Sequence, residues 1–364
     1  MTSTTDVEEA IRAVRSSLPE CERLIVAVSG GVDSIVLLRA LAADRKTKTQ
    51  LIAAHFRHGT RSSQEHAADR AIVIANAADL SIPVVTGSSA EPMFASPGSG
   101  GPEATARQRR YAFLRAVADS CGARTILTAH SRDDQIETVV MRLLSGIDSA
   151  LLRGIRDDAW YGDYRLIRPL LDVSKQDIVR YARASLFSWR EDPTNRSSAF
   201  RRNVVRNEIL PEARKGWPAL DGDLLLLQRE MASRDRLTRE SAASIPWWID
   251  GDRIFIAGKE FYAADQAVRL HLLYELFTRL DAIDRKNRPS HRFFAPLLAA
   301  EPESDGILLE GRGVRISRVG QTLVLHQLLS GLGNDGIFEK QKKERRRKDV
   351  HERRSEPKQQ ETRS

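Results

Sequence analysis

Two glycines, two serines and an aspartate follow a short apolar run near the start of the chain. The run Leu24–Val28 leads directly into Ser29–Ser34, SGGVDS, after which a helical pattern begins. Glycines at such a turn let backbone N–H groups approach an anion closely, and the N-terminus of the helix adds the positive end of its dipole. Serine hydroxyls can donate hydrogen bonds to phosphate, whereas Asp33 would repel phosphate unless a divalent cation lies between them. The segment therefore predicts a phosphate loop that works with Mg²⁺, and a plain helix start is the alternative.

A second group of ionisable residues follows a strand-like run that ends at His130. Asp133, Asp134 and Glu137 come three, four and seven positions after this histidine, so they can share one face of a helix. Near a triphosphate, such carboxylates can hold Mg²⁺ or receive a cationic substrate. An acidic helix start that only complements the helix dipole would have the same sequence pattern.

Two pairs of arginines have helical spacing. Arg107 and Arg110 lie three apart, next to Tyr111, and Arg202 and Arg206 lie four apart. On a helix each pair shares a face, where guanidinium groups can neutralise phosphate or pair with a carboxylate. Ordinary charge on the surface of a helix is the alternative for both pairs.

Two histidines, His55 and His58, follow another apolar run. A pair of imidazoles suggests zinc, but no third ligand stands at a suitable spacing. We therefore expect this segment to contact a nucleotide base or phosphate.

Alternating strands and helices would position these residues. Between Leu24 and Leu171, short β-branched runs alternate with segments whose apolar spacing is near 3.6. The expected strands are Leu24–Val28, Gln50–His55, Ile82–Thr86, Thr125–Thr128 and Arg165–Ile167. The expected helices are Ile35–Ala43, Ser63–Leu80, Pro102–Ser120 and Asp133–Leu144. This alternation predicts an α/β fold with a doubly wound, Rossmann-like parallel sheet, in which ligands bind at the carboxyl ends of the strands.

A smaller α+β domain is expected after this sheet. The helices expected first are Ser174–Leu186, Phe200–Ile209, which Pro211 ends, and 221–243. They are followed by strand Arg253–Ala257, helices Ala263–Arg279 and His291–Ala299, and hairpin strands Gly313–Arg318 and Thr322–His326. The expected domains are a catalytic domain at 1–215, a helical linker at 216–244, a C-terminal domain at 245–330 and a disordered tail at 331–364.

The composition narrows the class of protein. A chain of 364 residues with 41% apolar residues suits a globular protein of two or three domains. No apolar run approaches the roughly 20 residues of a membrane helix, and the first residues lack the pattern of a secretion signal, so we expect a cytoplasmic protein. Cys21 and Cys121 are the only cysteines, which excludes a disulfide scaffold and a Cys-x-x-Cys site.

Most of the positive charge lies at the end of the chain. The net charge is +8, and residues 339–364 hold eleven Lys/Arg against six Asp/Glu with almost no apolar residues. This segment is expected to add nonspecific affinity for RNA and to be dispensable for chemistry. Deleting 339–364 is therefore expected to raise the apparent KM for an RNA substrate and to leave kcat nearly unchanged. Steady-state kinetics of the truncated protein would check this, and a large fall in kcat would contradict it.

The motifs, taken in order, resemble a known family. SGGVDS fits neither the Walker nor the dinucleotide-binding pattern. With the other segments it is similar to the PP-loop ATP pyrophosphatases and, within them, to the tRNA(Ile)-lysidine synthetases. Those segments are HFRHGTR (His55–Arg61), EATARQRRY (Glu103–Tyr111), TAHSRDDQIETVVMRLLSG (Thr128–Gly146), RPLLD (Arg168–Asp172) and WREDPTN to FRRNVVRNEILP (Trp189–Pro211). The departures are Phe56-Arg57 where an aliphatic residue and Asn or Asp are usual, Ser131 where a second histidine is common, and a C-terminus too short for the further domain of longer members.

The resemblance implies an adenine nucleotide alpha hydrolase-like fold and a two-step reaction. ATP, with Mg²⁺, would adenylate the C2 oxygen of cytidine 34 in the isoleucine tRNA with a CAU anticodon and release pyrophosphate. L-lysine would then attack C2 and expel AMP, which changes codon reading from AUG to AUA. The sequence leaves the oligomeric state open, a homodimer included.

The resemblance also implies roles for individual residues. The ATP-binding residues would be Ser29, Gly30, Gly31, Val32, Asp33, Ser34, His55 and His130. The catalytic candidates are Asp33, Asp133, Glu137, Arg107 and Arg202, and the substrate-binding candidates are Arg110, Asp134 and Arg206. Asp33 and Asp134 would hold the metal. Asp133 and Glu137 would receive or deprotonate the amine of lysine, and the arginines would bind its carboxylate or the tRNA backbone.

Two other interpretations stay open from the sequence. Among other PP-loop ligases, sulfur transfer calls for extra cysteines and amidation for a glutaminase domain, and neither is visible. Ligases of small nucleotides or amino acids stay open, although the motifs at Glu137 and Arg202 do not fit them well. A non-catalytic tRNA-binding protein with a vestigial loop would bind tRNA with steep salt dependence and without ATP turnover. The intact Ser29–Ser34 segment argues against the second.

Overall fold

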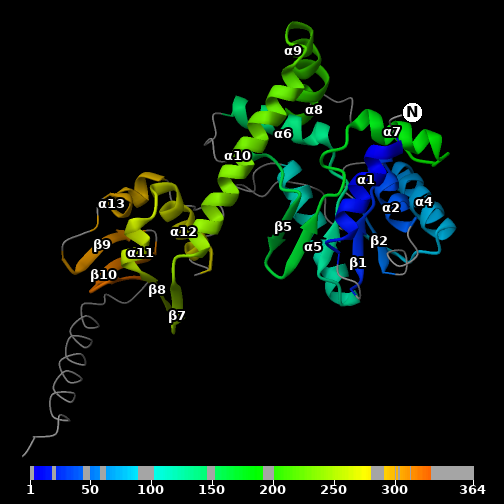
Figure 1. Ribbon diagram of the computed structural model, residues 1–364. Coiled ribbons are helices and arrows are strands. Elements are labelled where there is room, and N and C mark those ends of the chain that lie inside the picture. Colours follow the sequence, from blue (N-terminus) through cyan, green and yellow to red (C-terminus); the bar gives the residue numbers. More distant parts are fainter. Residues whose placement is uncertain are drawn as a thin grey trace, which may run out of the picture. The chain divides into compact units, whose positions relative to one another are not determined.

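The computed structural model describes residues 4–18, 22–43, 50–57, 63–88, 102–145, 152–191, 201–279, 291–299, 301, 304–311 and 313–328. The chain divides into two compact units, Met1–Leu237 and Thr238–Ser364 (Figure 1). His58, residues 192–200 and the expected tail lie outside the described residues.

A six-stranded sheet, sheet A, forms the frame of the first unit. Its order is β3-β2-β1-β4-β6-β5. The strands are β1 (Leu24–Ala27), β2 (Leu51–Arg57), β3 (Val84–Ser88), β4 (Thr125–Leu127), β5 (Asp158–Tyr161) and β6 (Tyr164–Ile167). Neighbouring strands are parallel except β5, which pairs antiparallel with β6, so the predicted doubly wound sheet is confirmed. Its direction of winding reverses between β1 and β4, and the loops after these two strands therefore meet at the point where such sheets bind ligands.

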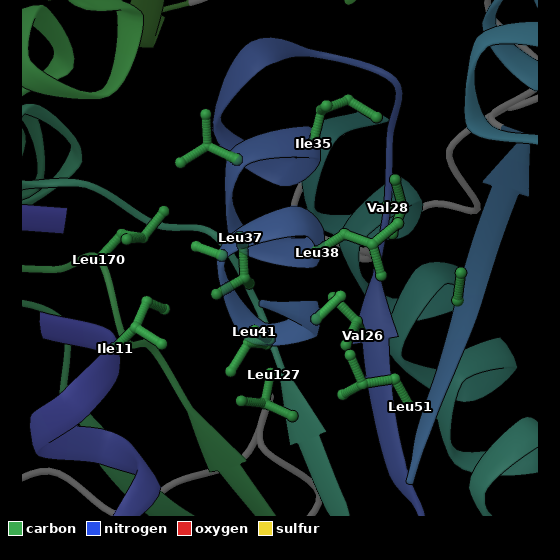
Figure 2. Packing of buried hydrophobic residues seen from close by; sticks show 14 of the residues in the cluster. Ile11, Val26, Val28, Ile35, Leu37, Leu38, Leu41, Leu51, Leu127 and Leu170 are labelled. Atoms are coloured by element: carbon green, nitrogen blue, oxygen red, sulfur yellow. The ribbon is translucent and has the colours of Figure 1, made fainter. Parts of the chain in front are cut away.

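Apolar side chains cover both faces of sheet A. Along β1, Leu24 and Val26 join one core and Ile25 joins the other, because side chains alternate across a strand. Helices α1 (Thr4–Arg15), α2 (Val32–Ala42), α4 (Ser63–Asp79) and α7 (Lys175–Ala184) contribute to the first core, and α5 (Pro102–Cys121) to the second. Figure 2 shows the buried leucines of α2 between β1 and the side chains of Ile11 and Leu170. This packing fixes the start of α2 relative to the sheet.

A smaller core docks a run of helical segments onto α6 (Arg132–Leu144). The segments are α8 (Arg201–Val204), the π-helical turn η3 (Val205–Ile209), α9 (Leu210–Gly216) and α10 (Leu220–Ala243). Val205 and Leu210 pack against Ile136 and Val139 of α6. The expectation that Pro211 ends the helix was wrong. The helical path continues through the π-helical turn η3 into α9, and Pro211 follows directly after this turn.

The second unit is an antiparallel sheet with helices packed on it. Its order is β7-β8-β11-β10-β9, with β7 (Trp247–Asp250), β8 (Arg253–Ala257), β9 (Gly306–Gly311), β10 (Val314–Val319) and β11 (Thr322–Gln327). Leu273, Phe277 and Phe294 lie in its buried core. The predicted tight turn is confirmed, because Val319 pairs with Thr322 across Gly320-Gln321.

Several elements of the structure differ from the sequence-based expectations. The helix expected at Ala263–Arg279 begins later, as α12 (Gln266–Arg279), because Ala264 is extended and ends a separate, unexpected helix, α11 (Gly258–Ala263). The one expected at His291–Ala299 is a 3-10 turn, η5 (His291–Phe294), followed by α13 (Ala295–Leu298). α1, β5, β7 and β9 were not expected. Across the described residues, no helix is both long and apolar enough to cross a membrane.

Candidate active site

The SGGVDS segment forms the turn between β1 and α2. Gly30 has a φ of +98°, a conformation that favours glycine, and Gly31 occupies the N-cap of α2. Gly31 has no side chain with which to cap the first N–H groups of α2. An uncapped helix start behind a glycine turn is the arrangement that binds phosphate, as the sequence predicts.

The two serines of this loop have different hydrogen bonds and different exposure. Ser34 is buried, donates to the carbonyl of Gly31 at 2.9 Å, and accepts from the amide of Ser29 at 3.1 Å. Ser29 is exposed, and its hydroxyl accepts from the amide of Gly31 at 3.3 Å. Ser34 therefore shapes the turn, and Ser29 carries the hydroxyl that a ligand can reach. Val32 is buried in the core beneath.

Two segments that are distant from the loop in sequence, at Asp69 and at Arg190, contact it. The amide of Arg190 donates to the carbonyl of Gly30 at 3.0 Å, and its guanidinium lies 3.5 Å from a carboxylate oxygen of Asp69 on α4. A Cβ added at Gly30 would lie 3.3 Å from the carbonyl oxygen of Asp69. Arg190, in the described part of the WREDPTN segment, thus contributes a backbone hydrogen bond to the loop, a role that the sequence did not reveal.

Replacing Gly30 with alanine is expected to destabilise the protein. The positive φ strains any L side chain, and the close carbonyl of Asp69 leaves little room for relaxation. We expect a loss of about 1–2 kcal/mol in the free energy of unfolding, measured by urea denaturation. Gly222→Ala, on helix α10 with open space around the new Cβ, is the matched control and should be neutral or slightly stabilising. Equal stability of Gly30→Ala and the wild type would contradict the strained loop.

Asp33 lies in the first turn of α2 and is paired with a lysine. Both of its carboxylate oxygens are 2.6 Å from Nζ of Lys175, the first residue of α7. Burial raises the pKa of Asp33, and Lys175 opposes that rise. No spacing or motif in the sequence pointed to Lys175, which is a single cation beside the N-cap Ser174, shortly after the RPLLD motif.

The three acidic side chains after His130 do not all have partners on the same element. Ser131 caps α6 in a capping box with Asp134, whose carboxylate accepts from the amide of Ser131 at 2.7 Å. Ser131 therefore fixes the start of α6. Asp133 turns toward α7 and accepts from the amide of Lys175 at 2.7 Å. The expectation of one shared face therefore holds for Asp134 and Glu137 but not for Asp133.

Arg202 and Arg206 form ion pairs with Asp134 and Glu137. Glu137 is only 2% exposed, and its oxygens accept from Nε of Arg202 at 2.7 Å and from Nε of Arg206 at 2.5 Å. Arg202 also lies 2.8 Å from Asp134. Burial opposes ionisation of Asp134, but Arg202 foremost holds its pKa below the usual range. Burial likewise opposes the charge of Arg206, yet the hydrogen bond with Glu137 raises the pKa of Arg206. We call these four residues the carboxylate–arginine cluster; they are more than ordinary surface charge.

The arginines of α5 gather on one aromatic ring. The guanidinium carbons of Arg107 and Arg110 lie 5.0 and 5.6 Å from the centroid of Tyr111, which supports the predicted common face. Burial lowers the pKa of Arg110, and the charges of Arg202 and Asp134 act on it as well. This places Arg110 in the electrostatic field of the carboxylate–arginine cluster.

Of the two described histidines of the predicted site, His55 is buried and His130 is half-buried. Nδ1 of His130 lies 3.0 Å from the hydroxyl of Thr128, and burial lowers the pKa of His130 to about 3. His55 lies in β2, and its Nδ1 is 2.9 Å from the carbonyl of Val28, which can only accept, so this nitrogen carries the proton. Burial lowers the pKa of His55 too. Neutral imidazoles can hydrogen-bond a nucleotide but add no charge against its phosphates. Phe56 packs on Phe113, with ring centroids 5.2 Å apart.

The lowered pKa of His55 gives a prediction about pH. The unfolded chain takes up a proton at His55 near pH 6.5, whereas the folded chain resists it, so stability falls as the pH drops below about 6.5. For a histidine that stays neutral when folded, the loss reaches at most about 1.4 kcal/mol at pH 5.5. His55→Gln should reduce the difference between urea denaturation at pH 7.5 and at pH 5.5, and the exposed His291→Gln should not. An unchanged difference in His55→Gln would refute the prediction.

The donor set at the loop suits a metal that arrives with a nucleotide. Among the described residues, no three His, Cys, Asp or Glu side chains gather so as to hold a metal ion. Asp33 and Asp134 do act on each other electrostatically. Mg²⁺ commonly takes one or two carboxylates together with waters and substrate phosphates. Two carboxylates beside a phosphate loop therefore fit Mg²⁺, although both are ion-paired with basic side chains here.

A phosphate loop at the switch point of a doubly wound sheet defines a class of nucleotide-binding proteins. The chain belongs to the PP-loop domain family, whose model matches residues 3–213. Among curated proteins, a tRNA(Ile)-lysidine synthase from Symbiobacterium thermophilum is 38% identical over 244 residues, which are 64% of this chain and 49% of that protein. A tRNA(Ile)-lysidine synthase from Thermus thermophilus is 35% identical over 309 residues, 83% of this chain and 56% of that protein.

The chain spans about half the length of these curated relatives. Among solved structures, the U34-tRNA thiolase NcsA from Methanococcus maripaludis has a TM-score of 0.52 at 16% identity, over 62% of this chain and 78% of that one. That likeness concerns the fold, and it agrees with the predicted adenine nucleotide alpha hydrolase-like sheet.

Proposed function

We propose that this protein is a tRNA(Ile)-lysidine synthetase, a ligase that forms a carbon–nitrogen bond at the expense of ATP. The observation that carries the proposal is the closeness of the uncapped SGGVDS loop to the partly buried carboxylate–arginine cluster, whose Asp134 and Arg206 act electrostatically on Asp33. The first element suits a triphosphate, and the second suits an amino acid. The names of the curated relatives agree with this combination.

In the first step, the loop residues would hold ATP for attack on its α-phosphorus. The C2 oxygen of cytidine 34 forms the new P–O bond, and the bond to pyrophosphate breaks. The amides at the start of α2 and the hydroxyl of Ser29 stabilise the negative charge that grows on pyrophosphate. Asp33 and Asp134 are the proposed ligands of Mg²⁺, which supplies further positive charge at the phosphates when bound. His55 and His130 are proposed hydrogen-bond partners of the nucleotide.

In the second step, the carboxylate–arginine cluster would hold lysine. Free lysine carries one carboxylate and two ammonium groups. Its carboxylate and α-ammonium can exchange partners with Arg202 or Arg206 and with Glu137, which leaves the ε-ammonium as the group that must lose a proton. The ε-amine must be neutral to attack C2, and Glu137 or Asp133 takes its proton. The new C–N bond forms, the C–O bond breaks, and AMP leaves with the oxygen. Arg107 and Arg110 are proposed contacts of the tRNA backbone or of AMP.

The proposed function also assigns roles to the domains of the chain. We propose that residues 1–215 form the catalytic domain, 216–244 a helical linker and 245–330 a tRNA-binding domain, with a basic tail at 331–364. Isoleucine tRNA with a CAU anticodon and L-lysine are the proposed substrates, ATP and Mg²⁺ the proposed cofactors, and the cytoplasm the proposed location. A homodimer also stays a prediction.

The products of ATP distinguish this proposal from its alternatives. With ATP, Mg²⁺ and the CAU transcript but no lysine, the protein should release pyrophosphate and leave AMP on the tRNA. Added lysine should then release the AMP. ADP and phosphate as products would contradict the proposed chemistry, and tRNA binding without any pyrophosphate would favour the non-catalytic alternative.

A further inference from the structure

Lys175 occupies a place at the phosphate loop that the proposed mechanism leaves unused. Its ammonium lies 2.6 Å from both carboxylate oxygens of Asp33, the residue proposed to hold the metal. A cation that contacts both oxygens takes up positions that Mg²⁺ would use on this carboxylate. If Asp33 holds the metal as proposed, Lys175 would compete with it for the same oxygens.

The backbone of Lys175 is fixed while its side chain has room to move. Its amide donates to Asp133 on α6 at 2.7 Å, and Ser174 caps the same helix end. The side chain is 44% exposed. A lysine carries its charge on a flexible four-carbon stem, so the ammonium can change partners without any movement of α7.

The ion pair is not needed to join α2 to α7. Ile178, Tyr181 and Ala182 of α7 already pack in the same core as the leucines of α2. Because its side chains are 44% and 27% exposed, the pair contributes less to stability than a fully buried pair would. Its position at the first turn of α2, beside the loop amides, is therefore better explained by ligand binding than by packing.

We propose that Lys175 exchanges partners during nucleotide binding, an inference that rests on the proposed use of ATP. In the nucleotide-free protein Lys175 neutralises Asp33, which burial would otherwise penalise. When ATP brings the metal to Asp33, the ammonium of Lys175 moves to the phosphate oxygens beside the same turn. Each anion then keeps a cation throughout, and Lys175 becomes a positioning residue for the departing pyrophosphate.

Two binding measurements without tRNA or lysine test this exchange on the full chain. The first is binding of Mn²⁺ to the nucleotide-free protein, followed by electron paramagnetic resonance. The second is calorimetric binding of α,β-methylene-ATP with Mg²⁺, an analogue in which the proposed scissile bond is blocked. The variants are Lys175→Gln, Lys175→Met, which keeps the apolar stem, and Lys175→Arg. Lys215→Gln is the matched control, because Lys215 also pairs with a carboxylate at 2.6 Å, in helix α9.

The two constants should move in opposite directions when the charge is lost. In Lys175→Gln and Lys175→Met, Mn²⁺ should bind roughly five- to tenfold more tightly because Asp33 is freed, and the analogue should bind roughly tenfold more weakly. Lys175→Arg should keep analogue binding within about threefold of the wild type, and Lys215→Gln should change neither constant. Mn²⁺ binding that is unchanged or weaker in both neutral variants, or unchanged analogue binding, overturns the exchange. A wild-type protein that binds no analogue overturns the proposed function and the exchange with it, whereas normal wild-type binding with unaffected variants overturns the exchange alone.

Discussion

Replacing Asp33 with asparagine should lower ATP-dependent turnover by about a thousandfold while the protein stays folded. Asparagine keeps the size of the side chain but removes the charge that is proposed to hold Mg²⁺ against the phosphates. The substitution removes the cost of holding a negative charge at a site where burial raises the pKa of Asp33. The ammonium of Lys175, whose side chain is 44% exposed, can be hydrated instead. We therefore expect the melting temperature to change by no more than about 3 °C. Pyrophosphate release and thermal denaturation measure the two effects.

Asp79→Asn is the matched control for this substitution. Asp79 forms an ion pair with Arg39 of α2 at 2.7 Å, but its own side chain is well exposed at the end of α4. Turnover should remain near the wild-type value in Asp79→Asn. If Asp33→Asn retained more than about a tenth of wild-type turnover, Asp33 would not be a metal ligand in the sense proposed.

The second large effect is expected at Glu137. Glu137→Gln keeps the shape of the side chain but leaves the guanidinium groups of Arg202 and Arg206 without their shared buried carboxylate. We expect the free energy of unfolding to fall by about 2 kcal/mol, less than for a fully buried pair because both arginines are partly exposed. The value of kcat/KM for lysine should fall by roughly a hundredfold or more, because the same carboxylate is proposed to receive the amine.

The control for Glu137 is Glu212→Gln. Glu212 pairs with Lys215 at 2.6 Å, but both side chains are exposed, so the loss should stay below about 0.5 kcal/mol. Urea denaturation and lysine-dependent kinetics of both variants separate the two roles of Glu137. A Glu137→Gln variant that is destabilised but has normal kinetics for lysine would make the cluster purely structural.

Apolar runs and helical spacing in the sequence were sufficient to predict most of the strands and helices that position the site. β1, β4 and α6 follow from apolar runs and helical spacing, and the topology then brings the loop at Gly31 beside the segment at His130. The hairpin of β5 and β6 was missed although its signal was present. Tyr161 pairs with Tyr164 across a turn in which Gly162 has a φ of +62°, and Gly-Asp is a typical pair for such a turn.

The contacts within the site could not be predicted in the same way. Glu137 and Arg202 are 65 positions apart, and spacing within one helix says nothing about a partner on another. Their pairing depends on the core that holds η3 against α6, and η3 is a π-helical turn that no sequence period indicated. Lys175 was missed for the same reason, because a single cation at a helix start gives no pattern until α7 is placed against α2.

Incorporation of labelled lysine tests the central claim most directly. The assay contains ATP, Mg²⁺ and an isoleucine tRNA transcript with a CAU anticodon, beside a transcript with uridine at position 34 and the Asp33→Asn protein. We predict that label enters only the transcript with cytidine 34, and only with the wild-type protein. Absence of label in every reaction, while ATP is still split to AMP and pyrophosphate with another acceptor, would contradict the proposed substrate.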